Sequence, residues 1–385
     1  MCTPYKYTEY KIVDVFTKTK YSGNPLAIVF LRHEEQISPN KMLQIAKEFN
    51  LEETAFVFPP TIIGESVFIR VRIFTPEEEV PFAGHPSVGV AALIGGMMEE
   101  VIQDQTKSNI DAKNAATLSC VADANIKRIT LVENAGDVKC EVKMGDSDIV
   151  GFATIQAPQE FQVFSEETFS VDEAASLIGL DSSDIIGQPV MAGVGLPFLM
   201  VEVESHDALR KTKPILQKFE TFRPRLKRCF GMIYVYFLPT DKSFDKQYHR
   251  SKHVADVDVT NQKDPSLSSF CKESNVEDEP ETAADIHARM FCPLNGGPED
   301  PATGSAGAAL IGYLGKQKHP SICRNSSQSV DGSLTTSKVK ISQGVEMGRP
   351  SVIYGKYVER EGCGKPEIWI GGYVVNTMSG TLMLI

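Results

Sequence analysis

The chain has 385 residues, of which 42% are hydrophobic and 23% are charged, and its formal net charge is -11 at pH 7. This length predicts two or three domains, because one hydrophobic core rarely organises more than about 250 to 300 residues. The acidic balance excludes the basic surface that phosphate backbones and anionic membranes select, so we expect neither nucleic acid nor a membrane as a partner.

Apolar runs predict a strand-rich chain with few helices. The predicted strands cover residues 10–16, 23–30, 54–58, 67–75, 128–142 (a hairpin), 196–203, 231–238, 351–358 and 367–377. The predicted helices cover residues 40–50 and 171–180. Ser38 and Pro39 have the residue types of an N-cap and a first helical position. Glu52 and Glu53 then fall at the junction between the first helix and the next strand, where a side chain can face a binding site.

Three polar stretches interrupt this pattern, at residues 103–115, 241–285 and 317–337. Their composition predicts surface insertions that loop out from the core or are disordered. The stretch 241–285 is also a candidate for contacts with a partner.

The cysteines and the apolar runs indicate a soluble, cytoplasmic protein. The eight cysteines are spread along the chain with no CxxC pair, which is typical of reduced thiols and not of a disulfide framework. The first residues, MCTPYKYTEYKIVDVF, lack the unbroken apolar core of a signal peptide. The longest apolar run, residues 88–98, is far shorter than the roughly 20 residues that a bilayer span needs.

An internal repeat is the most informative feature of the sequence. RIFTPEEEVPFAGHPSVGVAALIG, residues 72–95, aligns without a gap to RMFCPLNGGPEDPATGSAGAALIG, residues 289–312, at a constant separation of 217 residues. Nine of the 24 positions are identical, including an R-x-F-x-P start and an AALIG end. We therefore expect two halves of similar structure.

Each copy of the repeat predicts a strand, a loop rich in proline and glycine, and a buried helix of small residues wrapped by curved sheet. The N-terminus of such a helix carries free N–H donors and a partial positive charge, and Gly84 and Gly304 add no side chain to shield them. Two such N-termini would bind a small carboxylate. His85, Asp300 and Ser305 add polar groups to these loops, although Asp300 has an alternative role as the N-cap of its helix.

Five sequence blocks occur in the order and approximate spacing of a known family: GNPLAIV, NLEETAFVF, RIFTPEEEVPFAGHPSVGVAAL, RMFCPLNGGPEDPATGSAGAAL and QGVEMGRPSVI. From about residue 10 to the C-terminus, the chain resembles the phenazine biosynthesis PhzC/PhzF-like family of the diaminopimelate epimerase-like superfamily. The resemblance implies an α+β fold with two pseudo-symmetric domains, each a curved, barrel-like mixed β-sheet around a central helix. It also implies a homodimer.

We place the domain border near Pro158. Residues 1–158 would form the N-terminal domain and residues 159–385 the C-terminal domain, which would contain the polar insertions 241–285 and 317–337. The last strand, about residues 372–385, is a candidate to return to the N-terminal domain.

The resemblance also assigns the site. The family's catalytic glutamate falls on Glu53, with Glu52 at a variable position, and its other catalytic residues fall on His85 and Asp300. Its substrate-binding positions fall on three further residues, Gly84, Gly304 and Ser305. Without the resemblance, the residues themselves do not favour Glu53 over Glu52.

These assignments imply a cofactor-independent isomerase, with no metal, that moves a proton on a small carboxylate-bearing metabolite in a cleft between the domains. One alternative is a non-catalytic protein on the same fold that binds a ligand or a partner. A two-base amino-acid epimerase or racemase is less favoured, because such enzymes use a thiol at each helix N-terminus. Ala83 and Pro301 stand about where those thiols would be.

Overall fold

In the computed structural model, the described residues are 6–33, 37–63, 66–97, 127–145, 149–239, 284–294, 297–323, 326–329 and 333–384. The polar stretch predicted at 103–115 lies outside them, as does the stretch 241–285 apart from its last two residues. None of the described helices is long and apolar enough to cross a membrane.

The first half of the chain contains nine strands and two helices among its described residues. They are β1 (Lys6–Val15), β2 (Asn24–Phe30), α1 (Pro39–Phe49), β3 (Thr54–Val57), β4 (Thr61–Ile63), β5 (Ser66–Phe74), β6 (Glu79–Val80), α2 (Gly84–Gly96), β7 (Lys127–Glu133), β8 (Gly136–Met144) and β9 (Ile149–Gln156).

The second half of the chain also consists of strands and short helices among its described residues. Its elements are β10 (Phe161–Val163), α5 (Val171–Ile178), the 3₁₀ helix η2 (Ser182–Asp184), β11 (Ile185–Val194), β12 (Leu196–Val203), α6 (His206–Lys211), α7 (Leu216–Leu226), β13 (Ile233–Phe237), β14 (Ile286–Phe291), β15 (Glu299–Asp300), α9 (Gly304–Lys316), α10 (Pro320–Cys323), β16 (Ser326–Gln328), β17 (Leu334–Gln343), β18 (Ser351–Arg360) and β19 (Glu367–Leu384).

A closed ring of strands surrounds α2. Its order is β1, β2, β3, β5, β7, β8, β9 and β19, and β19 pairs with β1 to close it. The pairs β2–β3 and β5–β7 are parallel, and the other pairs are antiparallel. Nearly every residue of α2 is buried, which explains why the helix consists of small and apolar residues on all sides.

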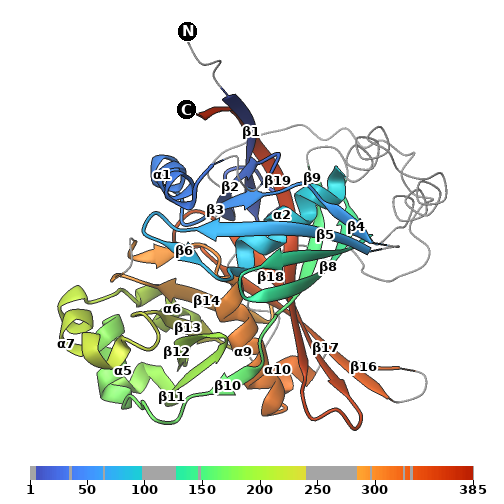
Figure 1. The fold of residues 1–385 in the computed structure, drawn as a ribbon. Helices are drawn as coiled ribbons and strands as arrows, with labels where there is room; N and C mark the ends of the chain where they lie inside the picture. Colours follow the sequence, from blue (N-terminus) through green and yellow to red (C-terminus); the bar gives the residue numbers. More distant parts are fainter. Residues whose placement is uncertain are drawn as a thin grey trace, which may run out of the picture.

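The second half repeats this arrangement around α9 (Figure 1). Strands β10, β11, β12, β13, β14, β17, β18 and β19 follow one another, and the pairs β12–β13 and β14–β17 are the parallel ones. The fold is therefore α+β with two pseudo-symmetric halves, each a curved mixed sheet around a central helix, as the sequence predicts.

Strand β19 belongs to both halves and runs along the whole molecule (Figure 1). Its residues 367–371 pair with β18, and its residues 374–384 pair with β1, apart from Thr377 at a bulge. The domain border near Pro158 stays a prediction.

One hydrophobic core joins the two halves. It contains Val88 and Leu93 of α2, Leu310 and Leu314 of α9, and Ile370 of β19. Separate clusters lie under α1 and between β11–β14 and the helices α5 and α7. The common core fixes the N-termini of α2 and α9 relative to each other.

The repeat is present, but its ungapped register is wrong beyond the first strand. Phe74 of β5 pairs with Glu79, and Phe291 of β14 pairs with Glu299. The two phenylalanines are 217 residues apart, whereas the two glutamates are 220 residues apart. The second loop is thus three residues longer.

The longer loop changes which residues are equivalent. Gly84 and Gly304 both begin a helix, so they correspond, and the two AALIG motifs do not. A shift of three residues is nearly one helical turn, so a helix of small apolar residues can match itself in the wrong register.

The predicted loop at 317–337 contains regular structure among its described residues. Helix α10 follows α9, and β16 forms a hairpin with the start of β17. Ser321 and Ile322 of α10 are buried, although the surrounding sequence is polar. The stretch was expected to loop out or to be disordered, and its described residues instead form a partly buried helix and an exposed hairpin.

Candidate active site

The N-termini of α2 and α9 meet backbone to backbone. A Cβ atom on Gly84 would lie 2.9 Å from Ser305 N and 3.1 Å from Gly304 Cα. A Cβ atom on Gly304 would lie 3.4 Å from Gly84 Cα. The close approach of the helices therefore requires glycine at position 84. A Cβ atom on Gly304 would instead be too close to the side chains of Ile370 and Phe16, at 2.8 and 3.2 Å. The three predicted substrate-binding residues lie together.

The end of α1 places Glu53 beside His85. Asn50 has a left-handed conformation, with φ of 51°, and its N–H donates to Ala46 O to end the helix. The chain then enters the buried strand β3 at Thr54. The Glu53 side chain is 20% exposed, and its Oε2 lies 3.4 Å from Nδ1 of His85, which is 6% exposed.

Asp300 is held by hydrogen bonds from both halves of the chain. Asn24 Nδ2 donates to Asp300 Oδ1 at 2.8 Å, and the Thr303 hydroxyl donates to Asp300 Oδ2. Thr303 is the N-cap of α9 and makes no side-chain cap hydrogen bond with the helix backbone. The alternative role of Asp300 as the N-cap is therefore wrong.

Asn24 connects the predicted residues, although no sequence pattern selected it for the site. Its Nδ2 also donates to Ala302 O at 3.0 Å and lies 3.4 Å from His85 Nδ1. The side chain is completely buried. Asn24 occurs in the GNPLAIV block, where an asparagine before a strand is also typical of a turn.

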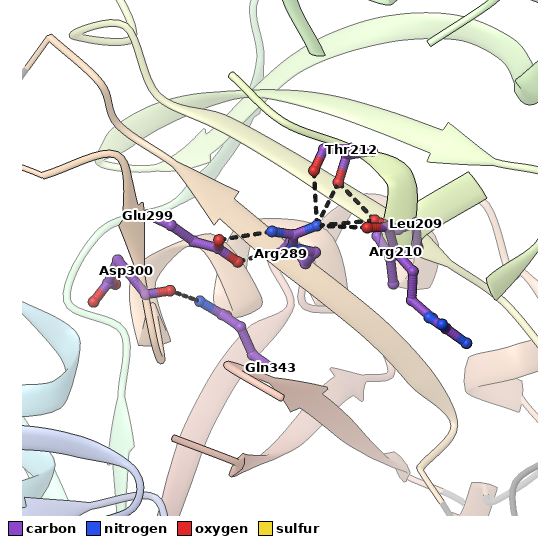
Figure 2. A network of polar contacts seen from close by, with 7 residues as sticks. All are labelled: Leu209, Arg210, Thr212, Arg289, Glu299, Asp300 and Gln343. Carbon is purple, nitrogen blue, oxygen red and sulfur yellow. Dashed lines mark hydrogen bonds and ion pairs between the residues drawn. The ribbon is translucent and has the colours of Figure 1, made fainter. Parts of the chain in front are cut away.

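The backbone of Asp300 is fixed by a second layer of contacts (Figure 2). Gln343 Nε2 donates to Asp300 O at 2.9 Å. Arg289 donates from Nε and one terminal nitrogen to both carboxylate oxygens of Glu299, at 2.8 and 2.7 Å. Its other terminal nitrogen donates to the end of α6, at Leu209 O, Arg210 O, Thr212 O and Thr212 Oγ1. Strand β15 is thus tied to α6 and β17.

The QGVEMGRP segment holds the loop before Asn24. Arg349 Nε donates to Gly23 O at 2.8 Å, and one terminal nitrogen donates to Asp14 Oδ1 at 2.8 Å and Ser22 O at 2.9 Å. The Arg349 guanidinium therefore links the second half of the chain to the β1–β2 loop from which Asn24 enters the site.

Burial controls the protonation of the site. It raises the pKa of the Glu53 carboxyl well above its usual range, and the carboxyls of Asp300 and Glu52 raise that pKa further. Burial also raises the pKa of Asp300, and it lowers the pKa of His85 to about 3. Burial thus favours the protonated form of Glu53 and the neutral form of the His85 imidazole, and such a pair can hold or release one proton.

Glu52 has a different environment from its neighbour. Burial, followed by the charges of Asp300 and Glu77, raises its pKa to about 7. Its Oε1 lies near Gly297, at 3.5 Å from where a Cβ would be. Glu53, and not Glu52, is the carboxyl in contact with His85.

Residues 13–380 match the model of a family described as phenazine biosynthesis-like protein, PhzC-PhzF. The chain belongs to the PhzC-PhzF family. It is 29% identical to an "Uncharacterized isomerase" of Mesorhizobium japonicum, over 97% of this chain and 98% of that protein. It is 25% identical to "Trans-2,3-dihydro-3-hydroxyanthranilate isomerase" of Pseudomonas aeruginosa, over 92% of this chain and 91% of that protein.

A solved structure shows the same fold as this PhzC-PhzF chain. The Bacillus anthracis phenazine biosynthesis protein of the PhzF family has a TM-score of 0.66 at 18% identity, and the match covers 98% of this chain and 100% of that one. The resemblance inferred from the five sequence blocks is confirmed by the family match.

Cys292, a described cysteine whose thiol interacts with the carboxyls of the site, is not suited to acid–base work in this PhzC-PhzF chain. Cys292 is buried, and its Sγ donates to Gly297 O at 3.3 Å. Burial raises the pKa of its thiol, and the charges of Asp300 and Glu52 raise it further. The N-caps of α2 and α9 are Ala83 and Thr303, neither of which has a thiol.

Proposed function

We propose that this protein is an isomerase that moves a proton on a small carboxylate-bearing metabolite, with Glu53 as the group that transfers the proton. The contact of 3.4 Å between Glu53 Oε2 and His85 Nδ1, at the point where α2 and α9 meet, carries the assignment. The names of the two relatives, both isomerases, support the reaction class.

One carboxyl group is enough for this chemistry. Glu53 takes a proton from one carbon of the substrate and returns a proton to another, so neither an oxidant nor a reductant is needed. Its raised pKa favours the protonated form and makes the carboxylate a strong base when it forms. The scheme requires no cofactor.

The remaining residues hold the substrate in this proposal. The backbone N–H groups near Gly84 and Gly304, with the Ser305 hydroxyl, bind the carboxylate and stabilise the charge that develops during transfer. His85 and Asp300 orient the rest of the molecule. The fixed positions of Asp300 and Asn24 mean that these donors and acceptors need little reorganisation.

The first test is solvent deuterium incorporation. The protein would be incubated in D₂O with a panel of small amino acids and cyclic acids that starts with trans-2,3-dihydro-3-hydroxyanthranilate, and mass spectrometry would follow exchange. We expect exchange in one compound and a loss of about 10²- to 10⁴-fold in Glu53→Gln, the range of a general acid–base group.

Glu52→Gln is the matched control, because it neutralises the adjacent carboxyl without touching His85. We expect it to retain activity within about tenfold of wild type, because it does not transfer the proton. Full activity in Glu53→Gln would overturn the assignment of the proton-transferring group. Tight binding of a carboxylate without exchange across the panel would indicate a binding protein on the same fold.

A further inference from the structure

Glu133, the last residue of β7, is a buried carboxyl that the proposed reaction does not use. It is 4% exposed. Its Oε1 lies 2.6 Å from Ser87 Oγ in the first turn of α2, and its Oε2 is buried without a hydrogen-bond partner among the described residues. The next residues also contact the segment before α2, because Ala135 N donates to Pro81 O at 2.9 Å.

The number of hydrogens at Ser87 favours a proton on Glu133. Ser87 Oγ lies 2.7 Å from Ala83 O as well as 2.6 Å from Glu133 Oε1. A hydroxyl has one hydrogen, and a carbonyl oxygen can only accept. Each contact is a full two-centre hydrogen bond, with no hydrogen shared between two acceptors, when Ser87 donates to Ala83 and a protonated Glu133 donates to Ser87.

The other half of the molecule has an uncharged side chain at the equivalent position. Arg70 of β5 pairs with Val132 of β7. His287 of β14 is the counterpart of Arg70, and it pairs with Ser342 of β17. Glu133 and Gln343 are the next residues on their strands, so they correspond.

Gln343 shows what this position does beside α9. Its Nε2 donates to Thr303 Oγ1 at 3.1 Å and to Asp300 O at 2.9 Å, and its Oε1 accepts from Thr303 N at 3.3 Å. A neutral amide and a protonated carboxyl each offer both a donor and an acceptor. The two strand ends therefore hold the two helix N-termini in similar ways.

We propose that Glu133 is a positioning residue, which in its uncharged form holds the first turn of α2 through Ser87 and so fixes Gly84 and His85 for the reaction. The proposal rests on the proposed function only for its effect on turnover. Ionisation of Glu133 would remove the donor to Ser87 and place a buried charge beside the helix. The protein would then lose activity at alkaline pH.

The surroundings of Glu133 agree with an uncharged group. Burial raises the pKa of Glu133 to about 8, although the Ser87 hydroxyl and the charge of Arg70 lower it. Arg70 on β5 donates to Val132 O and Asn134 Oδ1. On β8 the Cys140 thiol faces Glu133, and burial followed by the Glu133 charge raises the pKa of that thiol.

The protonation of Glu133 can be measured without any substrate. Its pKa in the folded protein, about 8, lies above the usual 4.5, so the folded state keeps a proton that the unfolded state releases. The stability that it contributes is full below pH 4.5 and is lost as the pH rises through 8. Relative to Glu133→Gln, the wild-type unfolding constant should rise by up to about tenfold per pH unit between these values. If the ratio of the wild-type unfolding constant to that of Glu133→Gln does not change with pH, the proposal is overturned.

The positioning role has its own readout. Amide hydrogen exchange, corrected for the intrinsic rate, should show that peptides covering residues 84–88 lose protection in the wild type above pH 8 and keep it in Glu133→Gln. Ser87→Ala should lose protection at every pH, and Glu133→Ala should do so if it folds. Equal protection in wild type and Glu133→Gln at about pH 9 would refute the positioning role.

Measurements of turnover distinguish a failure of this proposal from a failure of the proposed function. If deuterium exchange identifies a substrate, wild-type kcat should fall above about pH 8, and Glu133→Gln should keep its activity there. A similar alkaline fall in both proteins would overturn the link to catalysis. If no compound exchanges, the proposed function fails, whereas the unfolding and protection experiments still decide the state and role of Glu133.

Discussion

Asn24 is the residue at which the two halves of the site come together. One nitrogen atom, Nδ2, contacts Asp300, Ala302 and His85, of which the first two belong to the second half of the chain. Its Oδ1 is buried without a hydrogen-bond partner among the described residues. A buried amide in this position orients both the carboxyl and the imidazole of the proposed site.

Replacing Asn24 by alanine should therefore affect both activity and stability. We expect turnover to fall by about 100-fold, because Asp300 and His85 lose their common partner and small displacements of such groups are costly. The loss of buried hydrogen bonds should lower the free energy of unfolding by about 1 to 3 kcal/mol. Asn40→Ala, on the exposed surface of α1, is the control for stability measured by denaturant unfolding. Unchanged turnover would show that Asn24 is only structural.

His85 gives a second prediction at this scale, in acid. Its pKa falls from 6.5 to about 3 on folding, because burial disfavours the charged imidazolium. The stability that this residue contributes is full above pH 6.5 and is lost as the pH falls towards 3, by up to about 1.4 kcal/mol per pH unit. As the pH falls over that range, the free energy of unfolding of the wild type should decrease relative to that of His85→Gln. His33→Gln, at an exposed position, is the control, and a difference independent of pH would contradict the assignment.

Some of these residues could be predicted from the sequence, and others could not. Glu53, His85 and Asp300 occur in distinctive loop motifs, which the family resemblance assigned to a site. Asn24 and Asp300 are 276 residues apart, and no local pattern reports a contact over that distance. The protonation of Glu53 depends on burial by the whole fold, so it could not be predicted from the neighbouring acidic residue.

At the scale of elements, the site depends on the contact between two helix N-termini. Helices α2 and α9 approach so closely that Gly84 has no room for an ordinary side chain, and Gly304 is crowded by the side chains of Ile370 and Phe16. The sequence predicted glycines that expose N–H groups, and the structure adds that these glycines bring the helices together. The register of the repeat was missed because helices of small apolar residues resemble each other after a shift of nearly one turn.

Gly84→Ala should separate the two helices. Its Cβ would lie 2.9 Å from Ser305 N, and a backbone atom cannot move aside as a flexible side chain can. We expect a loss of about 1 to 3 kcal/mol in the free energy of unfolding, as in other overpacked positions, together with weaker binding of the identified substrate. Gly96→Ala, at the other end of α2, is the matched control, because its Cβ would have contacts of 3.4 Å or more. Equal effects of the two changes on unfolding and on substrate affinity would contradict this explanation.

At the scale of the whole molecule, β19 makes the two halves depend on each other. The ring around α2 closes only because residues 374–384 pair with β1, and residues 369–375 of the same strand pair with β9. The core also continues from α2 to α9. A separate fragment ending at the predicted border near Pro158 would expose two unpaired strand edges.

A fragment of residues 1–158 should consequently fail to unfold cooperatively and should aggregate. The same fragment joined by a flexible linker to residues 367–384 should recover a cooperative transition, because the ring is then complete. Circular dichroism during heating and sedimentation of both fragments would test this. The control is the fragment of residues 1–158 linked in the same way to a scrambled sequence of residues 367–384. Cooperative unfolding of the fragment alone would show that β19 is dispensable for the first half.

The position of β19 also has a consequence for protein synthesis. β1 can pair early with β2, but β19, its partner on the other side, is not made until about 360 residues later, a delay of roughly 20 to 70 seconds at usual rates of translation. During that time the growing chain holds apolar strands with open edges, which readily pair with other chains. Successful production of this protein in a cell should therefore depend on translation speed and on the chaperones that bind nascent chains.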